Sequence, residues 1–237
     1  MTPMLFYGHR PPNMPTQSLP GRLIAIEGTD GVGRSTHVAL LKEWLEARGF
    51  AVLDTGFTRS ALAGAGIQRA KQGHTLDPMT LNLFYATDFW DRLERQIVPA
   101  LKAGMIALTD RYIFSLIARA TVRGVRPEWI EALYGFAPVP DLVVYLDVDV
   151  DRLIPRVLSS TGFDYWESGQ DYLPGDSLFD NFVQYQTDLL SEFRRLSSNY
   201  GFKTLDARGS VADVFGQICG EVEPLLASMQ TESEAEG

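Results

Sequence analysis

The chain has 237 residues, which suits one α/β domain large enough to bury a substantial core. Its 45% hydrophobic and 11% aromatic content indicates a globular protein, and its net charge of −9 argues against a nucleic-acid-binding surface, which would need basic patches. The single cysteine, Cys219, excludes an internal disulfide and fits the reducing cytoplasm, and no apolar run approaches the ~18 residues that a membrane span needs.

Strand-like and helix-like segments alternate along the chain, which predicts a parallel sheet with crossover helices. Five strands are expected, at Leu23–Glu27, Ala51–Asp54, Met105–Thr109, Leu142–Leu146 and Lys203–Leu205. Helices are expected at Ser35–Arg48, Ala61–Gln72, Pro78–Ala103, Phe114–Arg123, Pro127–Tyr134, Asp151–Leu158, Leu178–Ser198 and Ser210–Leu226. The expected architecture is a three-layer α/β fold, with helices on both faces of a five-stranded parallel sheet.

Three segments depart from this regular alternation. The first twenty residues hold five prolines and no long apolar core, so residues 1–21 are expected to form a flexible leader rather than a secretory signal, and residues 228–237 a short acidic tail. Residues 159–176 form a long irregular stretch, and such loops are usually lids over a site or disordered. Pro99 is expected to kink or split the long third helix, because proline removes a hydrogen bond and clashes with the preceding turn.

The segment from residue 28 to residue 36, G-T-D-G-V-G-R-S-T, carries the most informative motif of the chain. It matches the phosphate-binding spacing G-x-x-x-x-G-K-[ST], except that arginine takes the place of the lysine. The motif lies between a strand and a helix, where successive backbone N–H groups and a helix N-terminus bind polyphosphate. We expect a polyphosphate to be bound by Gly28, Thr29, Asp30, Gly31, Val32, Gly33, Arg34, Ser35 and Thr36. Ser35 would also ligate Mg²⁺; the alternative is a turn that merely connects the two elements.

The arginine of this motif, Arg34, leaves two possibilities open. Its planar guanidinium can hold the β- and γ-phosphates with two hydrogen bonds, whereas a lysine ammonium is a compact charge that follows the transferring oxygens. The motif therefore predicts nucleotide binding and leaves open whether the chain transfers the phosphoryl group. A protein that binds nucleotide without catalysis remains an alternative.

A second motif, Thr109-Asp110-Arg111-Tyr112, follows an apolar strand. An aspartate at the end of a buried strand beside a phosphate loop helps to hold Mg²⁺, so Asp110 is expected to lie at the metal site. Arg111 would point into the same cleft and clamp phosphate. The alternative is an ordinary Asp–Arg surface pair at the end of a strand.

The chain resembles thymidylate kinase and its nucleoside monophosphate kinase relatives over about residues 22–226. The resemblance rests on the two motifs above, on Ser115, and on the runs 140–147 (P-D-L-V-V-Y-L-D) and 205–207 (L-D-A). It implies a P-loop NTPase fold for residues 22–227 with a lid at about 159–176, and Mg²⁺-dependent transfer from ATP to a pyrimidine deoxynucleoside monophosphate, foremost dTMP. It also implies a cytoplasmic homodimer. Another nucleotide, or a nucleoside, stays open as the acceptor.

The resemblance also implies roles for residues on the acceptor side. Asp30 would orient the acceptor, and Arg59, after the second strand, would contact its monophosphate. Phe84 and Tyr85 lie where the family stacks an aromatic ring on the pyrimidine, and Tyr112 lies where a ring would crowd a ribose 2′-hydroxyl. Phe84 also belongs to an apolar helical stripe, so a core position remains an alternative for it.

Two departures from the family pattern concern arginines. The family usually has an arginine after a segment like 86–88 (A-T-D), where this chain has Phe89; Arg92, almost one turn later, is expected to take over its acceptor contact. The stretch 157–193 contains seven Asp or Glu but no Lys or Arg, although bacterial members place arginines in this lid. Other members place one directly after the loop aspartate, where this chain has Gly31.

The charge on the transferring phosphoryl group must therefore be neutralised by another arginine, which in such reactions contributes ~10³–10⁵ in rate. The candidates are Arg34, Arg119, Arg123, Arg152 and Arg156. Of these we favour Arg34 and Arg156. The lid is expected to close through aromatic packing and hydrogen bonds of residues 163–172, unless it is only a structural plug.

Overall fold

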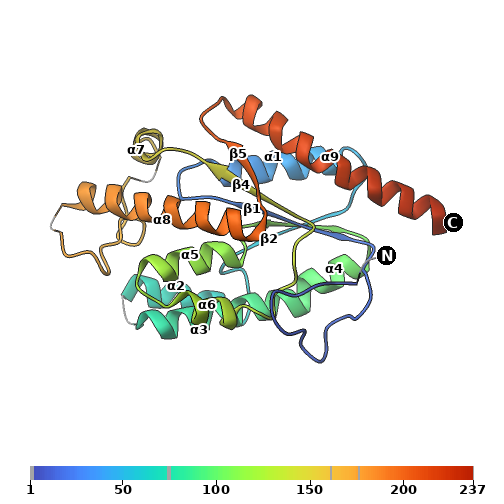
Figure 1. Cartoon of the computed structure of the whole chain (residues 1–237), viewed down its shortest axis with the longest axis horizontal. Coiled ribbons are helices and arrows are strands. Elements are labelled where there is room, and N and C mark those ends of the chain that lie inside the picture. The colour runs from blue at the N-terminus through green and yellow to red at the C-terminus, as the bar shows by residue number, and fades with distance from the viewer. Residues whose placement is uncertain (1–2, 74–75, 161, 176, 237) are drawn as a thin grey trace.

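The fold is that of a computed structural model, which describes residues 3–73, 76–160, 162–175 and 177–236 (Figure 1). Within these residues the sheet contains five parallel strands, β1 (Arg22–Glu27), β2 (Val52–Gly56), β3 (Ile106–Asp110), β4 (Leu142–Asp147) and β5 (Lys203–Asp206). Their order across the sheet is β2-β3-β1-β4-β5, so β1 lies between β3 and β4. All five strands expected from the sequence are present, and their bounds differ from the expected ones by one or two residues at most.

Helices cover both faces of the sheet, which confirms the three-layer α/β fold (Figure 1). One face is covered by α1 (Arg34–Glu46) and α9 (Val211–Glu236). The other face is covered by α3 (Pro78–Arg92), α4 (Val98–Lys102), α5 (Ile113–Val122) and α8 (Leu178–Tyr200). The helices α2 (Gly64–Gly73) and α6 (Pro127–Leu133) lie on the same side of the sheet. The short helix α7 (Val150–Leu158) comes directly after β4 in the chain.

The central strand β1 is buried on both faces. Leu23 and Ala25 belong to the apolar cluster formed with α3, α5 and α8, and Ile24 and Ile26 belong to the cluster formed with α1 and α9. This alternation follows from the two-residue period of a strand. A strand that is covered on both faces has an almost continuous apolar sequence, which is why R-L-I-A-I-E could be identified as a strand from the sequence.

The long helix expected at residues 78–103 is split, as predicted from Pro99. After α3 the backbone forms one π-helical segment, η1 (Leu93–Ile97), and then the short α4. The N–H of Val98 donates to the carbonyl of Leu93, a π-type bond that lengthens the turn just before the proline. A wider turn of this kind relieves the clash between the proline ring and the carbonyl four residues earlier.

The ends of the chain differ from the expectation of a free leader and a separate tail. Phe6 forms an antiparallel bridge with Pro138, the N–H of Tyr7 donates to the carbonyl of Ala137 at 3.1 Å, and Met14 is buried in the core. Phe6, Tyr7 and Met14 of the expected leader therefore contact the domain. At the other end, α9 continues through the acidic stretch to Glu236.

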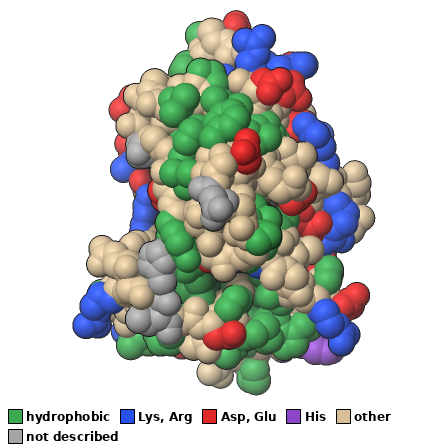
Figure 2. Space-filling model, turned by 90° about the vertical axis from the view of Figure 1, so that its left-hand side faces the viewer, with side chains coloured by type: hydrophobic (Ala, Val, Ile, Leu, Met, Phe, Trp, Pro, Cys, Tyr) green, Lys and Arg blue, Asp and Glu red, His purple; other side chains and the backbone are tan. Residues whose placement is uncertain are grey.

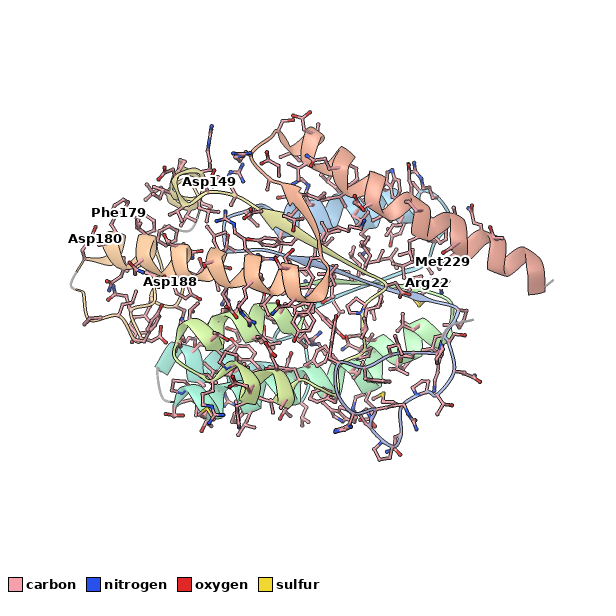
Figure 3. All side chains as sticks on the ribbon, viewed as in Figure 1. Arg22, Asp149, Phe179, Asp180, Asp188 and Met229 are labelled. Carbon is pink, nitrogen blue, oxygen red and sulfur yellow. The ribbon has the colours of Figure 1, made fainter. Side chains whose placement is uncertain are left out.

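The parallel strands place their carboxyl ends at one edge of the sheet, where ligands bind in open α/β sheets. Asp149, which follows β4, lies at this edge, whereas Arg22, at the start of β1, and Met229 lie at the opposite side (Figure 3). Loops and helix starts therefore surround a site at the end of the molecule that also carries α7 and the start of α8. None of the described helices has both the length and the apolar composition needed to cross a membrane.

Candidate active site

The loop between β1 and α1 has the backbone conformation that its glycines permit. Gly28, Gly31 and Gly33 have φ of 151°, 77° and 98°, a region that L-residues rarely adopt. A Cβ on Gly31 would also lie 2.6 Å from Cγ2 of Val157 on α7. No side chain caps the start of α1 at Gly33, so the first N–H groups of this helix are free to bind an anion.

Arg34, the first residue of α1, is turned into the loop. Its Nε lies 2.7 Å from Oδ1 of Asp110, and its Nη1 donates to the carbonyl oxygens of Gly28 and Thr29 at 2.5 and 2.6 Å. Only 8% of the residue is exposed. The Nε and Nη1 groups of Arg34 are therefore used within the protein, whereas its Nη2, 4.0 Å from Oδ1 of Asp30, keeps donors that a phosphate oxygen can accept from.

Ser35 and Asp110 meet at the predicted metal site. The Ser35 hydroxyl donates to Oδ2 of Asp110 at 2.8 Å. Burial raises the pKa of the Asp110 carboxyl, but the charges of Arg34 and Arg111 and the hydrogen bonds from Arg34 and Ser35 together outweigh burial, so the pKa is lowered and the carboxylate is ionised. Oxygen ligands of these kinds suit Mg²⁺, which usually keeps several waters and binds through one or two protein groups plus phosphates. Within the described residues, no cluster of three or more His, Cys, Asp or Glu could hold a metal. The fit to Mg²⁺ therefore depends on nucleotide phosphates.

Asp30 is a buried carboxylate at the centre of three arginines. It forms ion pairs with Arg111 and Arg119, and the Nη2 of Arg34 lies 4.0 Å from its Oδ1. Burial raises the pKa of Asp30, but the charges of Arg111, Arg119 and Arg34 outweigh burial and lower the pKa well below its usual range. The second motif and α5 thus bring two arginines to the aspartate of the phosphate loop.

Arg111 is held in this position by a strained backbone and a buried glutamate. Its φ of 72° is unusual for a residue other than glycine, and strain of this kind concentrates at functional sites. Glu27, at the end of β1, accepts hydrogen bonds from the N–H groups of Tyr112 and Ser115, at 2.8 and 3.1 Å, and from the Ser115 hydroxyl. The fully buried Glu27 therefore ties the turn that carries Arg111 to the strand that carries the phosphate loop.

The segment expected as a lid lies over this cluster. Glu167 borders the same cleft as Asp30, and burial together with the negative charge of Asp30 raises the pKa of Glu167 to about 7. The segment is attached to α5 by Arg123, whose Nε and Nη2 lie 2.7 and 3.0 Å from the two oxygens of Asp171. It is attached to α2 by Trp166, whose Nε1 donates to the carbonyl of Lys71 at 3.2 Å. The contacts combine hydrogen bonds with aromatic side chains, as the sequence of the segment predicts.

Two adjoining hollows lie on the α3–α5 side of the phosphate loop. The charged cleft, of about 300 Å³, is bordered by Asp30, Arg34, Ser35, Arg59, Asp110, Arg111 and Glu167, among others. The inner cavity, of about 180 Å³, lies between α2, α3, α5 and the lid and is bordered by Leu81, Asn82, Leu116, Tyr165 and Trp166, among others. Both hollows are bordered by Lys71, Tyr85 and Arg119, which therefore lie at their junction.

A third hollow, the loop cavity, lies on the other side of the phosphate loop. It has a volume of about 640 Å³ and is bordered by the phosphate loop, the end of α7 and the segment before α9. Arg156 of α7 borders it and donates to the carbonyls of Val32 and Ala207, at 3.2 and 3.0 Å. The phosphate loop thus separates two spaces, as a transfer between two bound molecules requires.

Comparison with known protein families agrees with this arrangement. The sequence model of the family described as Thymidylate kinase matches residues 26–218, which run from the end of β1 through β5 into the first turns of α9. The chain belongs to the thymidylate kinase family. It is accordingly a nucleoside monophosphate kinase, an enzyme that transfers a phosphoryl group.

Individual members of the thymidylate kinase family are similar to this chain over most of its length. A protein of Saccharolobus solfataricus described as "Probable thymidylate kinase 2" is 35% identical over 196 residues, 82% of this chain and 92% of that protein. A "Probable thymidylate kinase" of Thermococcus kodakarensis is 31% identical over 217 residues, 86% of this chain and 98% of that protein. A "Thymidylate kinase" of Shouchella clausii is 32% identical over 217 residues, 88% of this chain and 97% of that protein.

Two of the residues expected to meet the acceptor of a thymidylate kinase border the hollows. Arg59 borders the charged cleft, where its Nη1 lies 2.9 Å from Oδ1 of Asp54 and 45% of its side chain is exposed. Tyr85 borders both the charged cleft and the inner cavity. Either residue is therefore within reach of a nucleotide in these two spaces.

Two other aromatic residues lie elsewhere, which corrects their expected roles. Phe84 is 39% exposed, and its ring faces Gly66 of α2, because a residue next to Tyr85 on a helix points about 100° away from it. Tyr112 is buried and donates its hydroxyl to the carbonyl of Pro138 at 2.7 Å. Within the described part of the chain neither residue borders the inner cavity or the charged cleft.

Arg92 also borders neither the inner cavity nor the charged cleft among the described residues. It is 1% exposed, and its Nε lies 3.0 Å from Oδ2 of Asp88. Asp88 in turn accepts hydrogen bonds from the N–H groups of Thr58 and Ser60, at 3.1 and 3.0 Å. The pair therefore supports the loop that carries Arg59, while Phe89 packs its ring 5.2 Å from that of Tyr112 in the core.

The structure adds three residues that sequence reasoning did not place in the site. Glu167 and Lys71 border the charged cleft, and Arg119, named from the sequence only among the candidate arginines, pairs with Asp30. The sequence carried one signal for Glu167, because it is an acidic residue in a lid that contains no Lys or Arg. No local pattern distinguishes Lys71 from an exposed helical lysine, because the residues that surround it come from α3, α5 and the lid.

Proposed function

We propose that this member of the thymidylate kinase family transfers the γ-phosphoryl group of MgATP to dTMP, forming ADP and dTDP. The observation that carries the proposal is the pair of spaces on either side of the phosphate loop, with Asp30, Arg111 and Arg119 at the border of one of them. The names of the similar proteins from three organisms support dTMP as the acceptor.

On the donor side, we place the phosphates of ATP at residues Gly28–Thr36 and its nucleoside in the loop cavity. The uncapped start of α1 supplies N–H groups, and Ser35 and Asp110 would hold Mg²⁺ together with the phosphates. When bound, the Mg²⁺ ion would neutralise charge on the transferring group. We assign the remaining neutralisation to Arg34 and Arg156, which approach the loop from α1 and α7.

On the acceptor side, we place the base of dTMP in the inner cavity against Tyr85 and its phosphate in the charged cleft, near Arg59 and Arg111. A nucleotide phosphate is already ionised at neutral pH, so the transfer needs positioning and charge neutralisation rather than a strong base. Asp30 would orient the acceptor. Its low pKa keeps it ionised, so it does so as a hydrogen-bond acceptor.

The experiment that tests the function is steady-state ADP formation from MgATP with dTMP, dUMP, dCMP, dGMP and dAMP, each offered separately. Selective turnover with dTMP would establish the function and would show that Arg34 can replace a lysine. Turnover with another acceptor only would redefine the substrate. Such a result would agree with Phe89, which stands where the family usually has an arginine.

A non-catalytic role has one observation in its favour, the hydrogen bonds of Arg34 to the loop carbonyls. They occupy the Nη1 donors, which a catalytic cation could otherwise present to phosphate. Binding of MgATP without turnover of any of the five acceptors would favour this second candidate.

We also propose that the protein is a cytoplasmic homodimer. The packed helices α2 and α3, with the segment just before α2, carry large exposed apolar side chains, those of Leu62, Met79, Leu83 and Phe84, which suit burial in an interface. The single, unpaired Cys219 is consistent with a reducing compartment. Sedimentation equilibrium of the wild type and of Leu83→Glu measures the oligomeric state; a wild-type monomer would contradict the proposal.

A further inference from the structure

The junction between the inner cavity and the charged cleft holds a cation without a carboxylate partner. Lys71, near the end of α2, is half-buried and borders both hollows. Among the residues that the structure describes, its ammonium has no ion pair and no hydrogen bond, and its Nζ lies 5.9 Å from the centroid of the Trp166 ring. A partly desolvated charge of this kind gains free energy when an anion binds beside it.

The other cations of the charged cleft are already paired. Arg34 contacts Asp110, Arg111 and Arg119 contact Asp30, and Arg59 contacts Asp54. Burial lowers the pKa of Lys71, and Arg119 lowers it further, while nearby Asp164, Asp30 and Glu167 act in the opposite direction. Burial is the largest of these effects, so on balance the pKa of Lys71 is lowered.

Lys71 contacts the lid through its backbone carbonyl. The indole N–H of Trp166 donates to the carbonyl of Lys71, and the same ring borders the inner cavity. The end of α2, the lid and the inner cavity therefore meet at this residue. A nucleotide whose base filled the inner cavity beside Tyr85 and Leu116 would extend toward the junction that Lys71 borders.

We propose that Lys71 binds the phosphate of the acceptor nucleotide, as the unpaired cation at the junction of the inner cavity and the charged cleft. The inference rests on the proposed function, because it places a nucleoside monophosphate in these two hollows. An ammonium offers three donors and a compact charge, which suit a phosphate oxygen without requiring a fixed plane. Lys71 thus supplies, from α2, a positive charge that the lid of this chain does not contain.

The test compares Lys71→Gln with the wild type by calorimetric titration with dTMP and with thymidine, which lacks the phosphate. We expect Lys71→Gln to weaken dTMP binding by about tenfold, the scale of one charge-assisted hydrogen bond, and to leave thymidine binding unchanged. Lys71→Arg should restore most of the affinity. Lys102→Gln, the same change at an exposed residue of α4, is the matched control and should bind both ligands as the wild type does.

Equal weakening of dTMP and thymidine would overturn the inference and place Lys71 against the base or sugar. Unchanged dTMP affinity in Lys71→Gln would overturn it as well, and if this variant still has wild-type turnover with dTMP, the proposed function survives alone. Binding of dTMP that depends on Lys71 in a protein without turnover would support the inference and overturn the proposed function. A wild type that binds neither ligand would overturn both. Matching melting temperatures establish that the variants are folded.

Discussion

Arg34 and Asp110 form an ion pair, with 2.7 Å between Nε and Oδ1, so the arginine that replaces the loop lysine is paired with the carboxylate expected at the metal site. The same Asp110 accepts a hydrogen bond from Ser35 through its other oxygen. Mg²⁺ that binds to Asp110 therefore competes with Arg34 and Ser35 for the two carboxylate oxygens. A lysine would not reproduce these contacts. Its ammonium is one compact charge, whereas the guanidinium of Arg34 spreads its donors over a planar fork that contacts Asp110 on one side and two loop carbonyls on another.

Replacing Arg34 by lysine is accordingly expected to lower the Mg²⁺ concentration needed for half-maximal ADP formation by several-fold, since Asp110 regains an oxygen for the metal. Titration of turnover with Mg²⁺ at saturating ATP and dTMP measures the change. Arg34→Met is the companion variant and should lower kcat by ~10²-fold or more, the scale of losing one group that stabilises transition-state charge. An unchanged Mg²⁺ requirement in Arg34→Lys would mean that the ion pair does not limit metal binding.

Asp110→Asn is expected to lower kcat by ~10²–10³-fold while the protein remains folded, because the amide keeps the shape of the side chain but removes the charge that Mg²⁺ needs. Asp188→Asn, the same change on the exposed face of α8 (Figure 3), is the control and should retain wild-type turnover. Wild-type turnover in Asp110→Asn would place the metal elsewhere.

Two ion pairs on neighbouring turns allow a direct test of the structural role of Arg92. Arg92 and Asp88 are both buried, whereas Arg95, paired with Asp91 at 2.8 Å, has a side chain that is 73% exposed. Arg92→Met should lower the free energy of unfolding by about 3–5 kcal/mol, because it leaves a buried carboxylate unpaired. Arg95→Met should change it by less than about 1 kcal/mol. Urea unfolding measures both, and a stable Arg92→Met that only raises the KM for dTMP would restore the acceptor role.

Glu167 makes stability depend on pH near neutrality. Burial and the charge of Asp30 raise its pKa from 4.5 to about 7, so between these values the folded protein binds more protons at this residue than the unfolded chain. Its contribution to stability is therefore fully present below about pH 4.5, falls as pH rises, and is lost above about pH 7. Glu167→Gln should remove this part of the pH dependence, measured as melting temperature between pH 5 and pH 8. Parallel profiles for the variant and the wild type would show that Glu167 is solvated.

The lid end of the molecule carries an exposed apolar surface as well as the site. In Figure 2 apolar side chains gather over the middle of this end, and most Lys and Arg side chains lie toward its margins. Phe179, at the start of α8 (Figure 3), is 46% exposed, and Leu158, at the end of α7, is 57% exposed. The lid sequence contains no Lys or Arg, and the arginines of the site, Arg111 and Arg119, are paired with Asp30 beneath it.

The sequence by itself determined the elements and the phosphate loop, because both depend on residues that are close in the chain. The alternation of apolar residues in Leu23–Glu27, the glycine spacing of the loop and Pro99 each act through the local backbone. The same reasoning brought Asp110 beside the loop, since parallel strands end at one edge of the sheet.

Only the tertiary structure decided which way each side chain of the site faces. Phe84 and Tyr85 are adjacent in the sequence, yet the packing of α3 directs Tyr85 into the inner cavity and Phe84 toward α2. The direction depends on how a whole helix is rotated against its neighbours, a quantity that a local pattern leaves undetermined. For the same reason Arg92 became a buried partner of Asp88, while Lys71, on a helix that the sequence predicted without a role, reached the junction of the two hollows.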